Sequence, residues 1–303
     1  MSGVLAAIAP IFALILAGYG LRRLNFPGQD FWPDMERLTY YVLFPALLVD
    51  SLSGKDTGGL PVALPALALV LAVCATALLL VLLRPRLGLS GPAFTSILQG
   101  AIRPNTYVGL SLASALLGER GLAHSAVILL VLVPLVNILS VAALNRHGEG
   151  RARTGPLGVL RELARNPLIL ACLAGVALNA VGQRLPFGLS DILTILGRGA
   201  LPLGLLAVGA GLRFQGARPW PLGLACLLHL ALLPLLAAGA CALLGAAPES
   251  RLVVVIFTAV PAAASSYILA RQMGGDADLM AAVITAETAA SALTLPLAVA
   301  WLG

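Results

Sequence analysis

The stretch GAIRPNTYVGLSLA, residues 100–113, decides how we interpret the rest of the chain. It places Arg103 and Pro104 in the middle of an otherwise apolar segment, and proline interrupts a helix by removing a backbone N–H. A second proline, Pro261 in TAVPAAASS (258–266), interrupts a later apolar segment. Small residues around both prolines allow two backbones to approach closely, so we expect two broken helices to cross here.

The composition around this stretch is that of a membrane protein. Of the 303 residues, 59% are hydrophobic and 11% are charged, whereas a soluble domain has about 45–50% apolar and about 25% charged residues. An ordinary soluble enzyme is therefore excluded. The net charge of +6 is explained by membrane topology, so we expect the lipid bilayer, and no nucleic acid, as a partner. The four cysteines lie in apolar runs without metal-ligand spacing, so no metal site is predicted.

Breaks at Gly, Pro and charged residues divide the chain into ten apolar segments, each long enough to cross a bilayer, for which about 20 residues suffice. The segments span residues 3–21, 33–52, 62–83, 92–117, 121–145, 166–183, 188–212, 219–245, 250–273 and 276–302. We number them as spans 1 to 10. The sequence thus predicts an all-α polytopic membrane protein with ten transmembrane helices.

Positive charge marks one side of the predicted membrane. One set of alternate connections carries thirteen arginines: Arg22, Arg23, Arg37, Arg84, Arg86, Arg146, Arg151, Arg153, Arg161, Arg165, Arg213, Arg218 and Arg271. The opposite set carries only Lys55, Arg120, Arg184 and Arg251. Because basic loops stay in the cytoplasm, we expect a multi-pass protein of the plasma (inner) membrane with both termini outside the cytoplasm. Residues 146–165 are then an Arg-rich cytoplasmic linker.

The chain also contains an internal repeat. An offset of 157 residues aligns three proline pairs, which are Pro10 with Pro167, Pro45 with Pro202, and Pro104 with Pro261. The repeats are residues 1–145 and 166–303, with five spans each, and an odd number of spans inserts the second repeat upside down. The prediction is a 5+5 inverted-topology repeat with proline-broken crossover helices in spans 4 and 9, an architecture common among secondary transporters.

Broken helices in a membrane are tolerated where protein or a hydrated cavity surrounds the exposed backbone, so we expect a binding site at the crossing. Arg103 is the leading anion-binding candidate, because guanidinium stays charged and binds carboxylate through two hydrogen bonds. Alternatively, it forms an ion pair with Glu287 or Asp50, or reaches toward the membrane surface. Tyr107 either closes over the substrate or packs. The predicted substrate-binding set is Arg103, Pro104, Asn105, Tyr107, Pro261, Ser265 and Ser266.

A second candidate group surrounds Glu287, in the middle of span 10. Ser291 shares its helical face, and Asn137 of span 5 is a polar neighbour of the crossing. A carboxyl group at this depth suits a proton carrier, or a Na⁺ ligand together with hydroxyl groups. Alternatively, Glu287 is the counter-ion of Arg103. His229 of span 8 is interpreted as a hydrogen-bonded structural residue.

Motifs for ATP binding and hydrolytic chemistry are missing from the sequence. It contains no GxxxxGK[ST], HExxH or GxSxG motif, which argues against an ATP-driven pump and a membrane hydrolase. We therefore expect no enzyme activity, no catalytic residues and no cofactor other than H⁺ or Na⁺ as a coupling ion.

Four runs carry a resemblance to a known family: residues 100–113, NPLILACLAGVALN at 166–179, ALPLGLLAVGAGL at 200–212, and residues 261–297. The chain resembles the auxin efflux carrier family, a branch of the bile-acid sodium symporter superfamily. The resemblance implies a scaffold of spans 1, 2, 6 and 7 that often dimerises, and a mobile transport unit of spans 3–5 and 8–10. It also implies that Asn105, after the crossover proline, binds a carboxylate. Ala262 departs from this pattern, because several relatives carry Asn there as well.

The resulting prediction is a secondary active transporter of a small organic anion, a mono- or dicarboxylate such as malonate, malate or an auxin-like compound. It would work by elevator-type alternating access with proton coupling, and a homodimer would form through the scaffold helices. Two alternatives remain open from the sequence. One is a cation/proton or Na⁺ antiporter that uses Glu287, and the other is a membrane receptor that binds a ligand without moving it.

Overall fold

The computed structural model describes residues 2–28, 30–53, 63–150, 155–181, 188–213 and 219–303. Over these residues every regular element is a helix, and one isolated bridge joins Pro104 to Ala262. Five basic residues used for the predicted topology lie outside the described residues: Lys55, Arg151, Arg153, Arg184 and Arg218. The all-helical fold class is confirmed.

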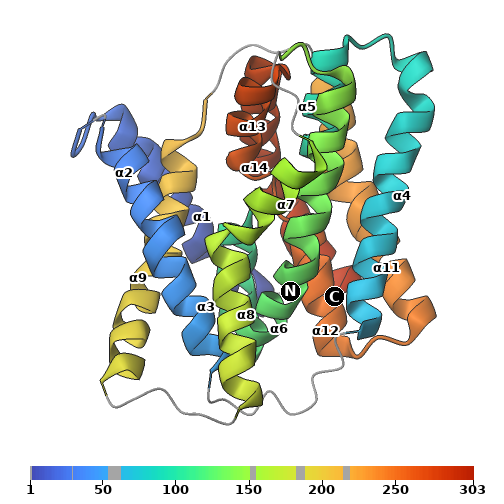
Figure 1. Ribbon diagram of the computed structural model, residues 1–303. Coiled ribbons are helices and arrows are strands. Elements are labelled where there is room, and N and C mark those ends of the chain that lie inside the picture. Colours follow the sequence, from blue (N-terminus) through green and yellow to red (C-terminus); the bar gives the residue numbers. More distant parts are fainter. Residues whose placement is uncertain (1, 29, 54–62, 151–154, 182–187, 214–218) are drawn as a thin grey trace.

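Figure 1 shows the helices as a bundle. Their bounds are α1 Ser2–Arg23, α2 Phe31–Leu38, η1 Thr39–Leu43, α3 Phe44–Leu52, α4 Ala63–Leu87, α5 Gly91–Ile102, α6 Thr106–His147, α7 Pro156–Ala164, α8 Pro167–Ala180, α9 Leu189–Ala210, α10 Pro219–Leu227, η2 Leu228–Leu232, α11 Leu233–Leu244, α12 Pro248–Ala259, α13 Ser265–Met273 and α14 Ala277–Leu302. Within the described ranges, six helical stretches are long and apolar enough to cross a membrane. The chain is therefore a multi-pass membrane protein.

Glycine and proline explain why some helices depart from regular geometry. Gly118 has φ 59° and ψ −139°, so α6 is two helices joined at a reversal, as the predicted break between residues 117 and 121 requires. The π-helical turns η1 and η2 end shortly before Pro45 and Pro234, which lack the N–H that a regular helix needs. The predicted linker 146–165 contains a helix, α7, which we had not expected.

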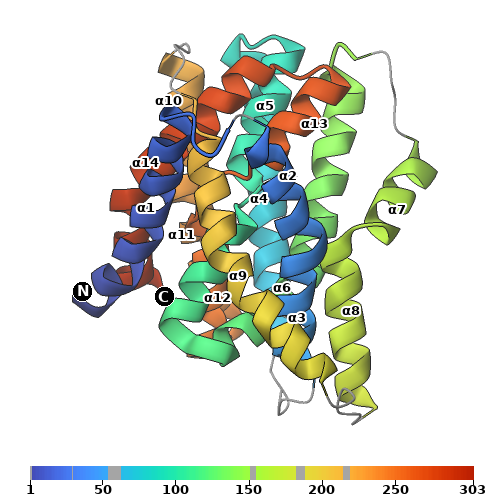
Figure 2. The same cartoon turned by 90° about the vertical axis from the view of Figure 1, so that its left-hand side faces the viewer.

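The helices pack in two groups. In the first, α1 runs along α9, and α3 lies against both α8 and α9. In the second, α4 packs on α11, and α12 packs on α6, α11 and α14. Figures 1 and 2 show α1, α3, α8 and α9 on one side of the bundle and α4, α5 and α11 on the other. The main apolar core, which includes Phe44, Phe94 and Phe257, joins the two groups.

Glycine brings α1 and α9 into backbone contact. A Cβ atom added to Gly18 would clash with the carbonyl oxygen of Leu206, and one added to Gly209 would clash with that of Ile15. Small residues are typical of such close helix contacts in membranes. The first group is thus held together by backbone proximity as well as by apolar side chains.

Candidate binding cavity at the helix crossing

The two proline breaks lie against each other and satisfy each other's backbone groups. Helix α5 ends at Ile102 and α12 ends at Ala259, and a short extended segment follows each. The N–H of Asn105 donates to the carbonyl of Pro261 at 2.7 Å, and the N–H of Ala263 donates to the carbonyl of Arg103 at 2.9 Å. Backbone polar groups that a helix would otherwise pair are thereby paired across the crossing, as the absence of water in lipid requires.

A cavity of about 710 Å³ adjoins this crossing. Such a volume is within the range of about 300–1,000 Å³ found for small-molecule sites. Arg103 and Asn105, which are 8% and 2% exposed, form its buried floor. Exposed residues, among them Arg37, Arg165 and Gln272, line the cavity at its open end. A smaller cavity of about 150 Å³ shares Arg103 with it.

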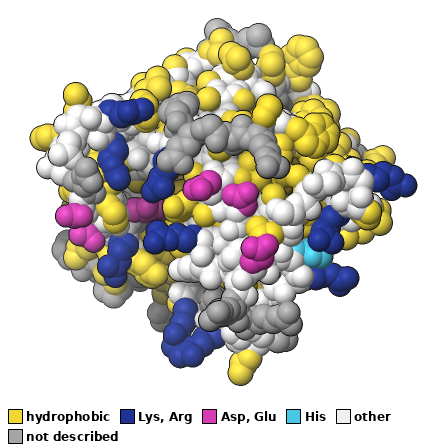
Figure 3. All heavy atoms as spheres, turned by 90° about the horizontal axis from the view of Figure 1, so that it is seen from above, with side chains coloured by type: hydrophobic (Ala, Val, Ile, Leu, Met, Phe, Trp, Pro, Cys, Tyr) yellow, Lys and Arg dark blue, Asp and Glu magenta, His cyan; other side chains and the backbone are white. Residues whose placement is uncertain are grey.

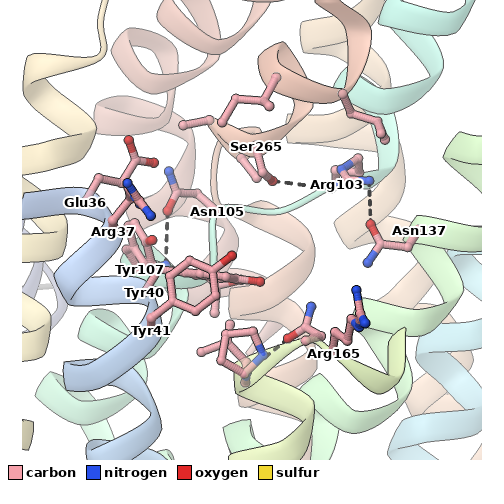
Figure 4. Close-up of a pocket in the computed structure, with 18 of the residues that line it drawn as sticks. Glu36, Arg37, Tyr40, Tyr41, Arg103, Asn105, Tyr107, Asn137, Arg165 and Ser265 are labelled. Carbon is pink, nitrogen blue, oxygen red and sulfur yellow. Dashed lines mark hydrogen bonds between the residues drawn. The ribbon is translucent and has the colours of Figure 1, made fainter. Parts of the chain in front are cut away.

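Arg103 is held in place by two neutral side chains. Its Nη1 donates to Oδ1 of Asn137 at 2.8 Å, and its Nη2 donates to Oγ of Ser265 at 3.3 Å. Figure 4 shows both bonds, which come from α6 on one side and from the start of α13 on the other. These partners orient the guanidinium toward the cavity that it lines.

Asn105 has its amide group oriented by helix capping. Its Oδ1 accepts hydrogen bonds from the N–H groups of Tyr107 at 3.0 Å and Val108 at 3.3 Å, which begin α6. Only an oxygen can accept these bonds, so the Nδ2 group is the end left to meet a ligand in the cavity. The N-terminus of α6 also adds a partial positive charge at this point.

Charged residues of both signs line the cavity, with cations in excess. Among the lining residues Arg37, Arg103 and Arg165 carry positive charge, and Glu36 carries negative charge. In a partly enclosed site this excess attracts anions and disfavours cations. The charge of the described lining residues therefore suits an anion better than a cation.

Tyrosine rings form one wall of the cavity. Tyr40 and Tyr41 pack edge to face with centroids 5.1 Å apart, while Tyr107 stacks on Phe44 of α3 at 4.6 Å. Figure 4 shows the three tyrosines together opposite Arg103. Tyr107 thus packs against α3 and also lines the cavity, while its closure over a substrate stays a prediction.

The remaining predicted residues are distributed differently from what the sequence suggested. Pro104 lines the smaller cavity, whereas Pro261 contributes to the helix crossing through its carbonyl, which accepts the hydrogen bond from the N–H of Asn105. Neither Pro261 nor Ser266, which is fully buried, is among the residues that line the two cavities. Asn137, predicted as an ion-coupling residue, lies in the cavity with Arg103 instead.

Glu287 and Ser291 lie outside the cavity lining, and both are fully buried in α14. Glu287 is paired with His229, whose Nδ1 is 2.7 Å from its Oε2. The hydroxyl of Ser291 donates to the carbonyl of Thr288 at 2.8 Å. The His229–Glu287 pair was missed by sequence reasoning, because 58 positions separate the two residues and neither motif nor spacing links them.

Other cavity residues were missed for related reasons. Asn166 precedes a proline and caps α8 through Oδ1, at 3.0 Å from the N–H of Leu168. The Asn–Pro sequence was a signal that a helix begins here. Glu36, Tyr40 and Tyr41 had no such signal, because they are placed in the cavity only by the packing of α2 and η1.

Comparisons with known proteins identify the family. The sequence profile of the membrane transport protein family matches residues 3–299 of the chain. The chain belongs to this family. The resemblance to the auxin efflux carrier family is thereby confirmed.

Two relatives match over nearly their whole length. A protein of Methanothermobacter thermautotrophicus named "Uncharacterized transporter" is 26% identical over 303 residues, which cover 97% of each chain. A protein of Rhizobium meliloti (strain 1021) named "Putative malonate transporter" is 26% identical over 310 residues, which cover 97% of this chain and 94% of the relative. This membrane transport protein is therefore similar to named transporters from end to end.

Proposed function

We propose that the protein is a secondary active transporter of a small organic anion. The observation that supports this most strongly is the position of Arg103, 8% exposed at the floor of a cavity formed where two helices break and cross. A buried charge in a membrane protein is costly and is typical of a functional site. Here it is oriented by Asn137 and Ser265 and directed into a space of substrate size.

We propose that the substrate carboxylate binds between Arg103, the Nδ2 group of Asn105 and the N-terminus of α6. The hydroxyl of Ser265 completes this group at the N-terminus of α13, a helix without a side-chain cap. Charge-assisted hydrogen bonds from guanidinium and the dipoles of helix N-termini favour the same ligand charge. Malonate is the first compound to test, because one relative is named as a malonate transporter.

The topology that we propose has ten spans in two inverted repeats, residues 1–145 and 166–303. Helices lie in all ten predicted apolar segments, and the antiparallel bridge between Pro104 and Ala262 pairs the corresponding breaks of the two repeats. The two chain ends lie close together in Figure 1. We place both of them outside the cytoplasm.

The distribution of arginines supports this orientation. Arginines lie in the last turns of α1, α4 and α6, and Figure 1 shows α4 and α6 reaching the upper end of the bundle. Seen from this end, Lys and Arg side chains are spread across the face (Figure 3). By the positive-inside rule this face is cytoplasmic. Because Gln272, an exposed residue that lines the cavity, belongs to α13 at the upper end of the bundle (Figure 1), we propose that the cavity opens to the cytoplasm.

The two packing groups provide a mechanism for alternating access. Tyr40, Asn166 and Pro167 approach the cavity from the first group, while Arg103, Asn137 and Ser265 approach it from the second. We propose that the first group, with spans 1, 2, 6 and 7, is a scaffold that also forms a homodimer. The second group, with spans 3–5 and 8–10, would carry the bound anion across the membrane by an elevator-type movement relative to this scaffold.

Uptake of radiolabelled malonate and other mono- and dicarboxylates into liposomes that contain the purified protein tests this function. We expect saturable uptake above that of empty liposomes, and a strong reduction by Arg103→Gln. The matched control is Arg86→Gln, since Arg86 is exposed and lies outside the cavity lining. Uptake equal to that of empty liposomes for the whole panel would contradict the proposal.

The same liposomes separate the alternatives. A cation antiporter would dissipate a Na⁺ or pH gradient without any organic anion, and a receptor would bind malonate at equilibrium without moving it. The excess of cationic side chains in the cavity favours the anion transporter over the cation antiporter.

A further inference from the structure

The His229–Glu287 pair is the most unusual buried group outside the cavity. His229 lies in the π-helical turn η2, and Glu287 lies in the middle of α14. Both side chains are 0% exposed, and Nδ1 and Oε2 are 2.7 Å apart. Ionisable side chains within a membrane are rarely retained for stability alone, so we expect the pair to have a functional role.

The pair is bonded directly to the helix crossing. The N–H of Ala262 donates to Oε2 of Glu287 at 2.9 Å, while the N–H of the next residue, Ala263, donates to the carbonyl of Arg103 at 2.9 Å. A single peptide unit thus separates the acid of the pair from the backbone of the anion-binding arginine. A change in charge or position of Glu287 is transmitted to the crossing through these bonds.

The surroundings of the pair are apolar and leave polar atoms unbonded. Among the described residues, His229 Nε2 and Glu287 Oε1 have no hydrogen-bond partner. The space beside Gly100, on α5, is bounded by Val283, Ala225 and Oε1 of Glu287. The two side chains of the pair have no solvent-exposed surface.

Few other charges face the pair. Cys226 of α10 is the other titratable side chain that interacts with Glu287, and Arg103, which follows α5, donates its hydrogen bonds to Asn137 and Ser265. The acidic and basic residues of the other helices that pack on η2 and α14 lie at or next to helix ends, and among the described residues they are Arg22, Arg23, Glu249, Arg251, Arg271, Asp276 and Asp278. The charge of the pair is therefore governed mainly by its own protons.

The protons of the pair can be counted. One hydrogen lies between Nδ1 and Oε2, and its position on nitrogen or oxygen does not alter the net charge. With that hydrogen alone, the pair carries one negative charge. A second proton, at Nε2 or Oε1, makes it neutral overall. Apart from the bond from the N–H of Ala262, no further hydrogen bond to the pair is present among the described residues, and an uncompensated net charge is costly in such a low-dielectric site.

We propose that His229 and Glu287 together form a proton-binding site that is loaded in the conformation described here and releases one proton when the crossing moves. This rests on the proposed anion transport, to which it adds the coupling ion and its site. Uptake of one proton neutralises the pair, and its release restores the negative charge beside Ala262. One proton that moves with the anion couples its accumulation to a pH gradient. The net charge moved is then zero for a monoanion and one negative charge for a dianion such as malonate.

Infrared difference spectroscopy of the purified protein tests the site without any substrate. A protonated carboxyl group has a characteristic C=O stretching band, which we expect in the wild-type protein and which should disappear in Glu287→Gln. The His229→Asn variant, which keeps a hydrogen-bond donor but cannot titrate, should shift the pH at which the band is lost. Asp278→Asn, an exposed carboxyl in the same helix, is the matched control and should leave the band unchanged. If neither a Glu287-dependent carboxyl band nor a His229-dependent imidazolium band appeared at any pH at which the protein is folded, the proposal would be overturned.

Liposomes test the coupling separately. With malonate as the probe, Glu287→Gln should retain exchange of internal for external malonate but lose accumulation driven by a pH gradient. Undiminished pH-driven accumulation by this variant would also overturn the proposal. If the wild-type protein moved no carboxylate, the proposed function would fail, while the infrared result would still decide whether the pair binds a proton.

Discussion

Asn105 and Pro261 are joined by a backbone hydrogen bond of 2.7 Å, although 156 positions separate them in the sequence. The bond links the residue that follows one helix break to the proline of the other break. It fixes the register in which the two breaks meet, and so determines where Arg103 and Asn105 lie relative to α13. The proposed anion site thus lies where two interruptions pair that would each be unfavourable alone.

Substitution of Arg103 should impair transport more than it impairs folding. Hydrogen bonds to charged groups contribute about 1.5–3 kcal/mol, so Arg103→Gln should lower kcat/KM for uptake roughly 10- to 100-fold. Arg103→Lys keeps the charge but loses the planar pair of donors, and should also be impaired. Initial uptake rates in liposomes measure this. Equal rates for Arg103→Gln and wild-type protein would show that Arg103 does not contact the anion.

Asn105 allows capping and binding to be separated. Asn105→Asp keeps a good N-cap for α6 but replaces the Nδ2 donor with a negatively charged oxygen. We expect near-normal thermal stability and at least a roughly tenfold loss of uptake, corresponding to about 1.4 kcal/mol. Asn105→Ala should in addition destabilise the protein by about 1 kcal/mol, because the cap is lost. Unfolding curves in detergent and uptake rates, measured in parallel, test both statements.

Ligand stabilisation should report binding without transport. A ligand that binds only the folded state at 100 times its Kd stabilises the protein by about 2.7 kcal/mol. Saturating malonate should therefore raise the Tm of the wild-type protein and of Arg86→Gln, and leave that of Arg103→Gln nearly unchanged. An equal rise in all three proteins would place the malonate site elsewhere.

The contact between α1 and α9 predicts a stability effect remote from the site. Gly209→Ala places a methyl group against the backbone of Ile15, and such overpacking costs about 1–3 kcal/mol. Gly223→Ala is the control, since a Cβ atom there would have no neighbour within 4 Å. Thermal unfolding of the two variants should differ clearly, with only Gly209→Ala destabilised.

Much of the fold was readable from the sequence because lipid imposes strong constraints on it. The apolar segments, the reversal at Gly118 and the breaks at Pro104 and Pro261 follow from hydropathy and from glycine and proline chemistry. Arg103 was predicted as a site residue because a charged group next to a proline in an apolar segment is conspicuous, whereas the binding role of Asn105 came from the family resemblance. The helix in the connection 146–165 was missed, because it is short and its surroundings are rich in arginine.

The remainder of the site depends on tertiary packing, which leaves no local pattern. Glu36 of α2 and Tyr40 of η1 reach the cavity only because these two elements lie beside the crossing. His229 was interpreted as an isolated histidine, and only the folded chain shows that Glu287 is its partner. Long-range pairs of this kind have no fixed spacing, so a single sequence does not reveal them.

The stack of Phe44 on Tyr107, with ring centroids 4.6 Å apart and planes inclined by 8°, has a kinetic consequence. Phe44 belongs to α3 and Tyr107 to α6, so the two rings are on opposite sides of the surface along which the groups would slide. Each turnover would have to separate them and form them again. The stack would then stabilise this conformation and slow the transition out of it. Replacing either ring with a smaller side chain would speed this transition and would also weaken the wall that the rings form around the bound anion.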